Sequence, residues 1–230
     1  MVTADAALVR AARDGLAELA DPVRAPRMQR YMRSALPYRG VLTPSWRRLA
    51  RRLGREHRLP DVDTLVATVR ELWHGARFRE ERYVALELTA DREYAAWQTP
   101  ALLPLYQELI VTGAWWDVVD EIAVHRIGPM LRACPAELGP VIQRWALDEH
   151  RWIRRAAVIC QVGSKAATDT TLLAHCIEAT LDDRNFFLRK GIGWALREYS
   201  KTDPRWVATF VAGHPGLSGL SRREASKYLG

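Results

Sequence analysis

Trp116 and Asp120 are the pair of side chains in this sequence whose types and spacing most suggest chemistry. If a helix begins at Ala114, the two side chains lie on one face of it, one turn apart. A carboxylate can stabilise positive charge, and an indole face can hold a cation. On this stretch alone, however, the simpler interpretation is a core tryptophan next to a solvated or salt-bridged aspartate.

The residues around this pair predict the helix that must position it. An apolar stripe typical of a buried helix face lies on the neighbouring arc and comprises Trp115, Val118, Val119 and Ile122. An apolar run at 102–111 comes before it, and Thr112-Gly113 is expected to separate the two helices. The stretch therefore predicts two consecutive helices, with the candidate pair on the second.

Apolar residues recur at helical spacing along the whole chain, and no stretch alternates long enough to predict a strand. In the first third, Thr43-Pro44 is expected to supply the cap and first position of a helix at 45–55. The later helices are expected at 62–73, 80–90, 100–111, 138–147, 152–162, 168–181, 185–199, 204–211 and 221–229. The sequence predicts an all-α protein.

A faint internal repeat relates the segments that begin at Glu81, Ile153 and Leu188. Each is expected to begin the second helix of a pair, with a repeat length of roughly 35 residues that is typical of HEAT-like or TPR-like units. Stacked pairs form an α-α superhelix whose inner wall is lined by one helix from each pair. We therefore expect a HEAT-like helical repeat solenoid with a concave basic face, forming a single domain over 1–230.

The basic residues suggest an acidic partner. The chain of 230 residues has a formal net charge of +7 and nine tryptophans, whose rings suit stacking on bases as well as packing in a core. The helix at 45–55 is dense in arginine, at Arg47, Arg48, Arg51, Arg52 and Arg55. Contact with phosphates and a simply solvated face remain equal alternatives for these arginines.

Several other classes of protein are disfavoured. The three cysteines, Cys134, Cys160 and Cys176, occur in apolar helical stretches without a Cys-x-x-Cys motif, so we expect reduced core residues in a cytosolic protein. No metal site is predicted. The N-terminal residues do not resemble a signal peptide, and no segment approaches the length and hydropathy of a membrane span.

The repeat brings further side chains towards Trp116 and Asp120. Equivalent helices beginning near Trp152 and Asn185 would lie next in line, and they carry Arg155 and Trp194. An acid, an arginine and two indoles could thus converge without a deep pocket. The alternatives are a salt bridge for Arg155 and a core position for Trp194 beside Gly191 and Gly193.

Two motifs are specific enough to indicate a family: Trp115-Trp116-Asp117-x-Val119-Asp120 and Gly193-Trp194-x-Leu196-Arg197-Glu198-Tyr199. Shorter matches extend through nearly the whole chain, at Tyr31-Met32, Gly40-Val41, Thr43-Pro44, Arg70-Glu71-Leu72-Trp73, 108–112, Arg154-Arg155-Ala156-Ala157 and 220–225. On these residues the chain resembles the AlkD-type DNA alkylation repair proteins, which are monofunctional DNA glycosylases built from HEAT-like repeats.

The resemblance implies a role for particular residues. The catalytic acid falls on Asp120, its aromatic walls on Trp116 and Trp194, and the arginine beside the lesion strand on Arg155. Tyr31 falls on a DNA-contacting position, and we expect further DNA contacts from Arg47, Arg48, Arg154, Arg155, Arg189 and Lys190. One departure is Leu42, where a family member can carry a glutamine that approaches the duplex.

The implied activity is hydrolysis of the N-glycosidic bond of cationic N3- and N7-alkylated purines in double-stranded DNA, without a base-flipping pocket, a cofactor or strand cleavage. We expect a monomer in the cytoplasm, associated with the nucleoid if the source is a bacterium, and no membrane partner. Two alternatives stay open. One is a non-catalytic DNA-binding relative, and the other is a HEAT-type protein-interaction scaffold whose binding would be insensitive to salt.

Overall fold

The computed structural model describes residues 3–229, and every regular element in that range is helical. This confirms the all-α prediction and agrees with a helical repeat fold. The chain divides into two compact units, Met1–Trp97 and Gln98–Gly230. The single domain over 1–230 and its concave basic face stay predictions.

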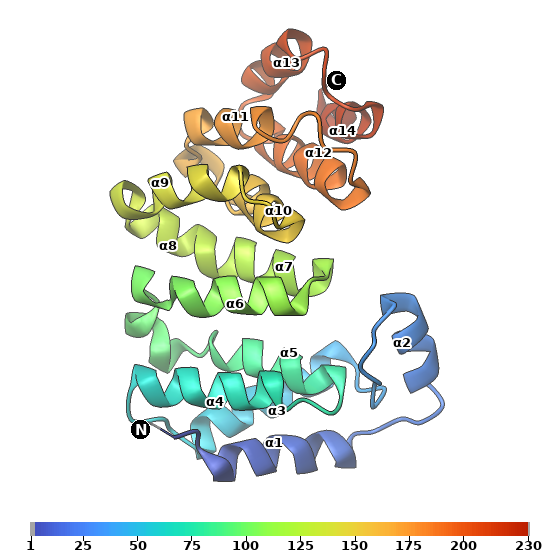
Figure 1. Cartoon of the computed structure of the whole chain (residues 1–230), viewed down its shortest axis with the longest axis vertical. Helices are drawn as coiled ribbons and strands as arrows, with labels where there is room; N and C mark the ends of the chain where they lie inside the picture. The colour runs from blue at the N-terminus through green and yellow to red at the C-terminus, as the bar shows by residue number, and fades with distance from the viewer. Residues whose placement is uncertain (1–2, 230) are drawn as a thin grey trace. The chain divides into compact units, whose positions relative to one another are not determined.

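Unit 1 is built from five α-helices, drawn in blue to green in Figure 1. Their bounds are α1 Ala6–Glu18, α2 Ala25–Met32, α3 Thr43–Glu56, α4 Val62–His74 and α5 Arg79–Leu88, followed by a 3-10 helix at Arg92–Trp97. Helices α1, α3 and α4 all pack against α5. The centre of this packing is apolar and almost fully excluded from solvent, with Leu8, Leu16, Leu53, Leu65 and Trp73 among its members.

The loop that leads into α3 is held by the buried carboxylate of Glu80. Its Oε1 accepts the backbone N–H groups of Gly40 at 2.9 Å and Val41 at 3.1 Å. Gly40 has a φ of 82°, and a Cβ there would lie 2.3 Å from the carbonyl oxygen of Asp21, so only glycine fits. Helix α3 then begins at Thr43 with Leu42 as its N-cap, so the predicted cap at Thr43 is wrong by one residue.

Unit 2 contains the remaining helices, drawn in green to red in Figure 1. Their bounds are α6 Leu103–Gly113, α7 Trp116–Ile122, α8 Gly128–Ala133, α9 Pro135–Ala146, α10 Arg151–Ile159, α11 Thr170–Glu178, α12 Phe186–Ser200, α13 Pro204–Gly213 and α14 Gly219–Ala225. Helix α10 packs against α7 on one side and α12 on the other, and α12 packs against α14. Helices α7, α10 and α12 therefore lie side by side in the unit.

The chain turns between α6 and α7 later than the sequence predicts. Helix α6 continues through Gly113, and Ala114 ends it in the left-handed conformation with a φ of 39°. Trp115 is extended and serves as the N-cap, so α7 begins at Trp116 rather than at Ala114. Trp116 and Asp120 nevertheless lie in the same helix with the predicted spacing.

The residues Gly128-Pro129 are typical of a helix break, but no break occurs there in the described structure of unit 2. Helix α7 continues through a π-helical turn, Ala123–Ile127, directly into α8. A proline inside an α-helix crowds the carbonyl four residues earlier, and a wider π turn relieves such crowding. Gly128 lies against the carbonyl oxygen of Cys160, which would be 2.3 Å from a Cβ, so the continuous helix packs closely on the end of α10.

The internal repeat is visible in detail between the α9–α10 and α11–α12 loops. Asp148 and Asp183, 35 positions apart, each accept a backbone N–H from the second residue after them at 2.7 Å. Arg154 and Arg189, at the same interval, each donate to the backbone carbonyl of the corresponding aspartate. The repeated residues therefore fasten each loop to the helix that follows it.

The cysteines differ in their surroundings. Cys160 and Cys176 are buried free thiols, and burial raises the pKa of Cys176 to about 12. Cys134 is only half-buried because it lies at the junction before α9, so its predicted core position is wrong. The two buried thiols are held in the unreactive protonated form.

Candidate site at the start of helices α7, α10 and α12

Asp120 and Arg155 form a bidentate ion pair between α7 and α10. The Nε of Arg155 donates to Oδ1 of Asp120, and Nη2 donates to Oδ2, both at 2.7 Å. The Arg155 side chain is 5% exposed, whereas that of Asp120 keeps 20% of its surface accessible. The planar guanidinium thus fixes the orientation of a carboxylate that still reaches solvent.

The same guanidinium also reaches the third helix. Its Nη1 donates to the backbone carbonyl of Phe187, in the first turn of α12. Three of the five guanidinium N–H donors are therefore used within the protein. The salt bridge considered as an alternative for Arg155 is present, while its predicted contact with DNA stays a prediction.

The pKa of Asp120 is raised above its ordinary value. Burial is the largest cause, because it disfavours the charged form, and the hydrogen bonds and charge of Arg155 lower the pKa and offset part of this effect. Asp117 raises the pKa further by repulsion. The negative charge of Asp120 is therefore only partly compensated by the protein.

An aromatic cluster joins the beginnings of the same three helices. The ring of Phe187 lies 5.2 Å from the rings of both Trp115 and Trp152, centroid to centroid, and the two indoles are 6.0 Å apart. Phe186, which is largely exposed, meets Phe187 edge to face. Phe187 and Trp152 were not identified from sequence; a recurring aromatic residue at the start of each helix is the signal that could have found them.

Trp116 and Trp194 are the two predicted aromatic walls. Trp116 is the first residue of α7, and Trp194 lies on α12 two turns after Phe187. Both indoles are half-buried, so neither is confined to the core. Val118, Val119 and Ile122 are instead the fully buried residues of α7. The role of the two tryptophans as walls stays a prediction.

Like Arg155, the other three predicted DNA-binding residues of unit 2 make bonds within the protein. Arg154 pairs with Asp183 at 2.6 Å in addition to its bond to the loop carbonyl, and Arg189 donates to the carbonyl of Asp183 at 2.9 Å. Lys190 pairs with Glu224 at 2.7 Å. These bonds have structural roles of their own, and a contact with DNA would have to share or replace them.

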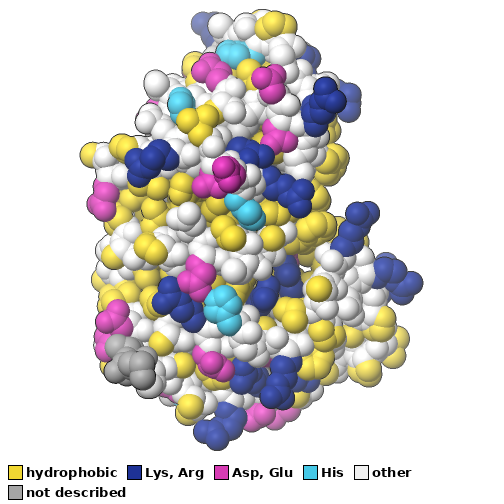
Figure 2. All heavy atoms as spheres, in the orientation of Figure 1, with side chains coloured by type: hydrophobic (Ala, Val, Ile, Leu, Met, Phe, Trp, Pro, Cys, Tyr) yellow, Lys and Arg dark blue, Asp and Glu magenta, His cyan; other side chains and the backbone are white. Residues whose placement is uncertain are grey.

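The predicted DNA-binding residues of unit 1 are more accessible. Tyr31 on α2 is 76% exposed, and Arg48 on α3 is also exposed. Arg47 is half-buried and pairs with Glu87 at 3.4 Å. Figure 2 shows basic side chains projecting from the region of α2, next to apolar and uncharged side chains.

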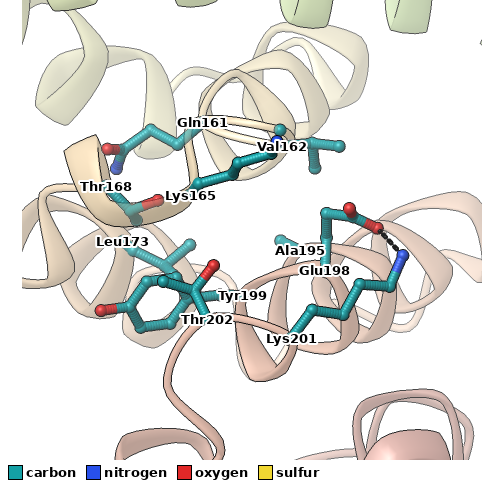
Figure 3. Close-up of a pocket in the computed structure, with 11 residues that line it drawn as sticks. Gln161, Val162, Lys165, Thr168, Leu173, Ala195, Glu198, Tyr199, Lys201 and Thr202 are labelled. Atoms are coloured by element: carbon teal, nitrogen blue, oxygen red, sulfur yellow. Dashed lines mark hydrogen bonds and ion pairs between the residues drawn. The ribbon is translucent and has the colours of Figure 1, made fainter.

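A cavity of about 130 Å³ lies elsewhere in unit 2, near the last turns of α10 and α12 (Figure 3). Gln161, Thr168, Leu173 and Tyr199 are among its lining residues, and Glu198 and Lys201 form an ion pair at its edge. None of the four predicted catalytic side chains lines it. The described residues contain no cluster of His, Cys, Asp or Glu suited to a metal ion. None of their helices is long and apolar enough to cross a membrane.

Two comparisons with known proteins indicate the same family. A sequence profile of the family described as DNA alkylation repair enzyme matches residues 12–229. A solved structure described as a predicted DNA alkylation repair enzyme from Enterococcus faecalis is 30% identical, with a TM-score of 0.81 over 91% of this chain and 96% of that one. The crystal structure of smu.31 from Streptococcus mutans is 17% identical, with a TM-score of 0.59 over 81% and 100%, and bears on the fold alone. A search of curated proteins finds no significant match.

Proposed function

The chain belongs to the DNA alkylation repair enzyme family, and on this premise we propose that it is an AlkD-type DNA glycosylase. The proposed reaction is hydrolysis of the N-glycosidic bond of cationic N3- and N7-alkylpurines in duplex DNA. The observation that carries the proposal is the carboxylate of Asp120, which is held rigidly by Arg155, only partly compensated in charge and still accessible to solvent.

The chemistry follows from the charge of the substrate. Alkylation at N3 or N7 makes the purine cationic and therefore a good leaving group. As the glycosidic bond lengthens, positive charge moves onto the deoxyribose and gives a state that resembles an oxocarbenium ion. Asp120 would stabilise that charge and orient or deprotonate the attacking water. No covalent intermediate with the protein is needed, so we expect no strand cleavage.

The aromatic side chains and Arg155 complete this scheme. Trp116 and Trp194 would hold the cationic base and sugar by cation–π contact, worth about 0.5–2 kcal/mol each. Arg155 would position Asp120 through the bonds described above, and its two remaining N–H donors would serve the backbone of the lesion strand. Such a site recognises charge rather than base edges.

Binding to undamaged duplex would rest on phosphate contacts from both units. In unit 1 the exposed side chains of Tyr31 and Arg48 are the first candidates. Phosphate contacts release counterions, so affinity should fall steeply with salt, and each lost contact should reduce the slope of log K against log salt by about one. Arg48→Ala measured against wild type tests this part of the proposal.

The proposed reaction is tested with purified protein and duplexes that each carry one lesion, under single-turnover conditions. We expect release of N7-methylguanine and N3-methyladenine, and no release of uracil, hypoxanthine or 8-oxoguanine. Release of uracil as fast as N7-methylguanine would contradict recognition by charge. Salt-dependent DNA binding without release of any base would instead identify a non-catalytic relative, and salt-insensitive binding to proteins would identify an interaction scaffold.

A further inference from the structure

We propose that Gly191 is a positioning residue for the reaction, because its missing side chain leaves the space in which Arg155 orients Asp120. This inference rests on the proposed function for its catalytic consequence, but its structural part can be tested without any reaction. Gly191 lies on α12. Because glycine has no side chain, its residue type alone does not suggest a role in the site.

The geometry around Gly191 is tight on the side of α10. A Cβ built on Gly191 would lie 2.9 Å from Nη1 of Arg155 and 3.2 Å from Cγ2 of Ile159. The Nη1 atom is the one that donates to the carbonyl of Phe187. Phe187 precedes Gly191 by one helical turn, so the two residues border the same end of the guanidinium.

The guanidinium cannot move away from an added Cβ without losing bonds. Its Nε and Nη2 are both engaged with Asp120, and the three nitrogens belong to one rigid plane. A shift of Nη1 therefore either breaks the hydrogen bond to the carbonyl of Phe187 or rotates Nε and Nη2 away from the carboxylate of Asp120. The burial of the Arg155 side chain leaves it little room for another arrangement.

The backbone gives no reason for glycine at this position. Gly191 lies inside α12, and among the described glycines only Gly40 and Gly163 have a positive φ. Alanine is favoured over glycine inside a helix. Gly191→Ala therefore has two opposing effects. It raises the helix propensity of α12, and it displaces the guanidinium of Arg155.

Two other helical glycines provide matched controls in unit 2. Gly139 lies in α9, and a Cβ there would meet nothing within 4 Å apart from its chain neighbours. Gly139→Ala therefore reports the change to alanine in a helix without a tertiary clash, including the effect of an alanine before Pro140. Gly193 lies in α12 itself, where a Cβ would be 2.5 Å from Cβ of Glu224 and 3.0 Å from the carbonyl oxygen of Ser221. Gly193→Ala therefore reports a packing clash in the same helix that does not involve Arg155.

The experiment compares wild type, Gly191→Ala, Gly139→Ala and Gly193→Ala. We expect Gly191→Ala to slow single-turnover release of N7-methylguanine by about 10- to 100-fold, since small misplacements of catalytic groups have effects of this size. Its thermal midpoint and its affinity for undamaged duplex should stay close to those of wild type. Gly139→Ala should keep the wild-type rate, and Gly193→Ala should lose thermal stability.

An NMR titration of the Asp120 carboxyl carbon supplies a readout that does not depend on the reaction. A displaced Arg155 lowers the pKa of Asp120 less, so the pKa should be higher in Gly191→Ala than in wild type and unchanged in Gly139→Ala. If wild type releases no base, the proposed function fails while this titration still decides the role of Gly191. A wild-type pKa in a folded Gly191→Ala protein would overturn the inference.

A double-mutant cycle covers the case in which Gly191→Ala folds poorly. Arg155→Met removes the guanidinium that the added Cβ would meet, so the effects of Gly191→Ala and Arg155→Met on urea unfolding should not add. The change in the free energy of unfolding caused by the alanine should be less favourable in the wild-type background than in the Arg155→Met background. Equal effects in the two backgrounds would show that Arg155 and position 191 are not energetically coupled and would overturn the inference.

Discussion

Two carboxylates of unit 2, Asp120 and Glu224, differ in the number of cationic side chains that contact them. Asp120 has one cationic partner, Arg155. Glu224 has three, since it pairs with Lys190 at 2.7 Å, with Lys227 at 3.1 Å and with Arg197. Both side chains are largely withdrawn from solvent, and Glu224 has the larger number of cationic partners.

The difference appears in the pKa of each group. The pKa of Glu224 is lowered to about 2, chiefly by the hydrogen bond from Lys190. The pKa of Asp120 is raised, because burial outweighs the contribution of Arg155. Glu224 therefore stabilises the packing of α12 against α14, whereas at Asp120 burial disfavours the ionised carboxylate more than Arg155 favours it. The balance between burial and charged partners therefore differs between the two carboxylates.

Removal of one cationic partner should lower the free energy of unfolding more at Asp120 than at Glu224. Arg155→Ala leaves a buried carboxylate without a charged partner and should cost about 3 kcal/mol in the free energy of unfolding. Lys190→Ala leaves Glu224 with two cations and removes a partly exposed pair, so it should cost about 0.5 kcal/mol. Urea unfolding of both variants checks this, and equal losses would contradict the comparison.

Neutralisation of Glu224 should have an intermediate effect that depends on pH. Because the folded-state pKa is about 2 and the ordinary value is 4.5, its stabilisation is present above about pH 4.5 and is lost as the pH falls towards 2. Glu224→Gln should cost about 1 kcal/mol at pH 7, a value reduced by the exposure of Lys190 and Lys227. The difference from wild type should disappear near pH 2 in pH-dependent urea unfolding.

Neutralisation of Asp120 should change the pH dependence of the free energy of unfolding in the opposite direction to Glu224→Gln. This is the smallest of the expected effects on stability. Its folded-state pKa lies above the ordinary value of 3.8, so ionisation costs stability as the pH rises through the folded-state pKa. Relative to wild type, Asp120→Asn should become more stable as the pH increases above 3.8. A relative stability that falls with pH would show that Arg155 outweighs burial at this site.

Most of the fold could be predicted from the sequence because its signals are local. Apolar periodicity, prolines and caps predict most of the helices within a few residues of their bounds, but they do not predict α8. The errors occur where tertiary contacts override local preference. Ala114 adopts a left-handed conformation that alanine rarely takes, and a π turn carries α7 past Gly128-Pro129, where local rules predict a break.

The sequence could predict which side chains of the candidate site lie near one another, but not all of their connections. The repeat and the family resemblance indicated that Asp120 and Arg155 converge, and the structure brings these two side chains into contact. Their chemical roles stay predictions. The bond from Arg155 to the carbonyl of Phe187 involves a backbone atom, which no side-chain pattern can reveal. Arg154 and Arg189 carry the same charge as a DNA-binding arginine, yet their bonds to the loop carbonyls arise from the repeat. Only the three-dimensional arrangement separates these roles.

The most direct test of the account compares Asp120→Asn with Glu224→Gln in single-turnover release of N7-methylguanine from duplex DNA. Loss of an electrostatic stabiliser of a charged transition state typically costs about 10²–10³ in rate. The account predicts a loss of that size for Asp120→Asn, with binding to undamaged duplex retained, and a rate close to wild type for Glu224→Gln. A wild-type rate for Asp120→Asn, or equal losses in the two variants, would contradict it.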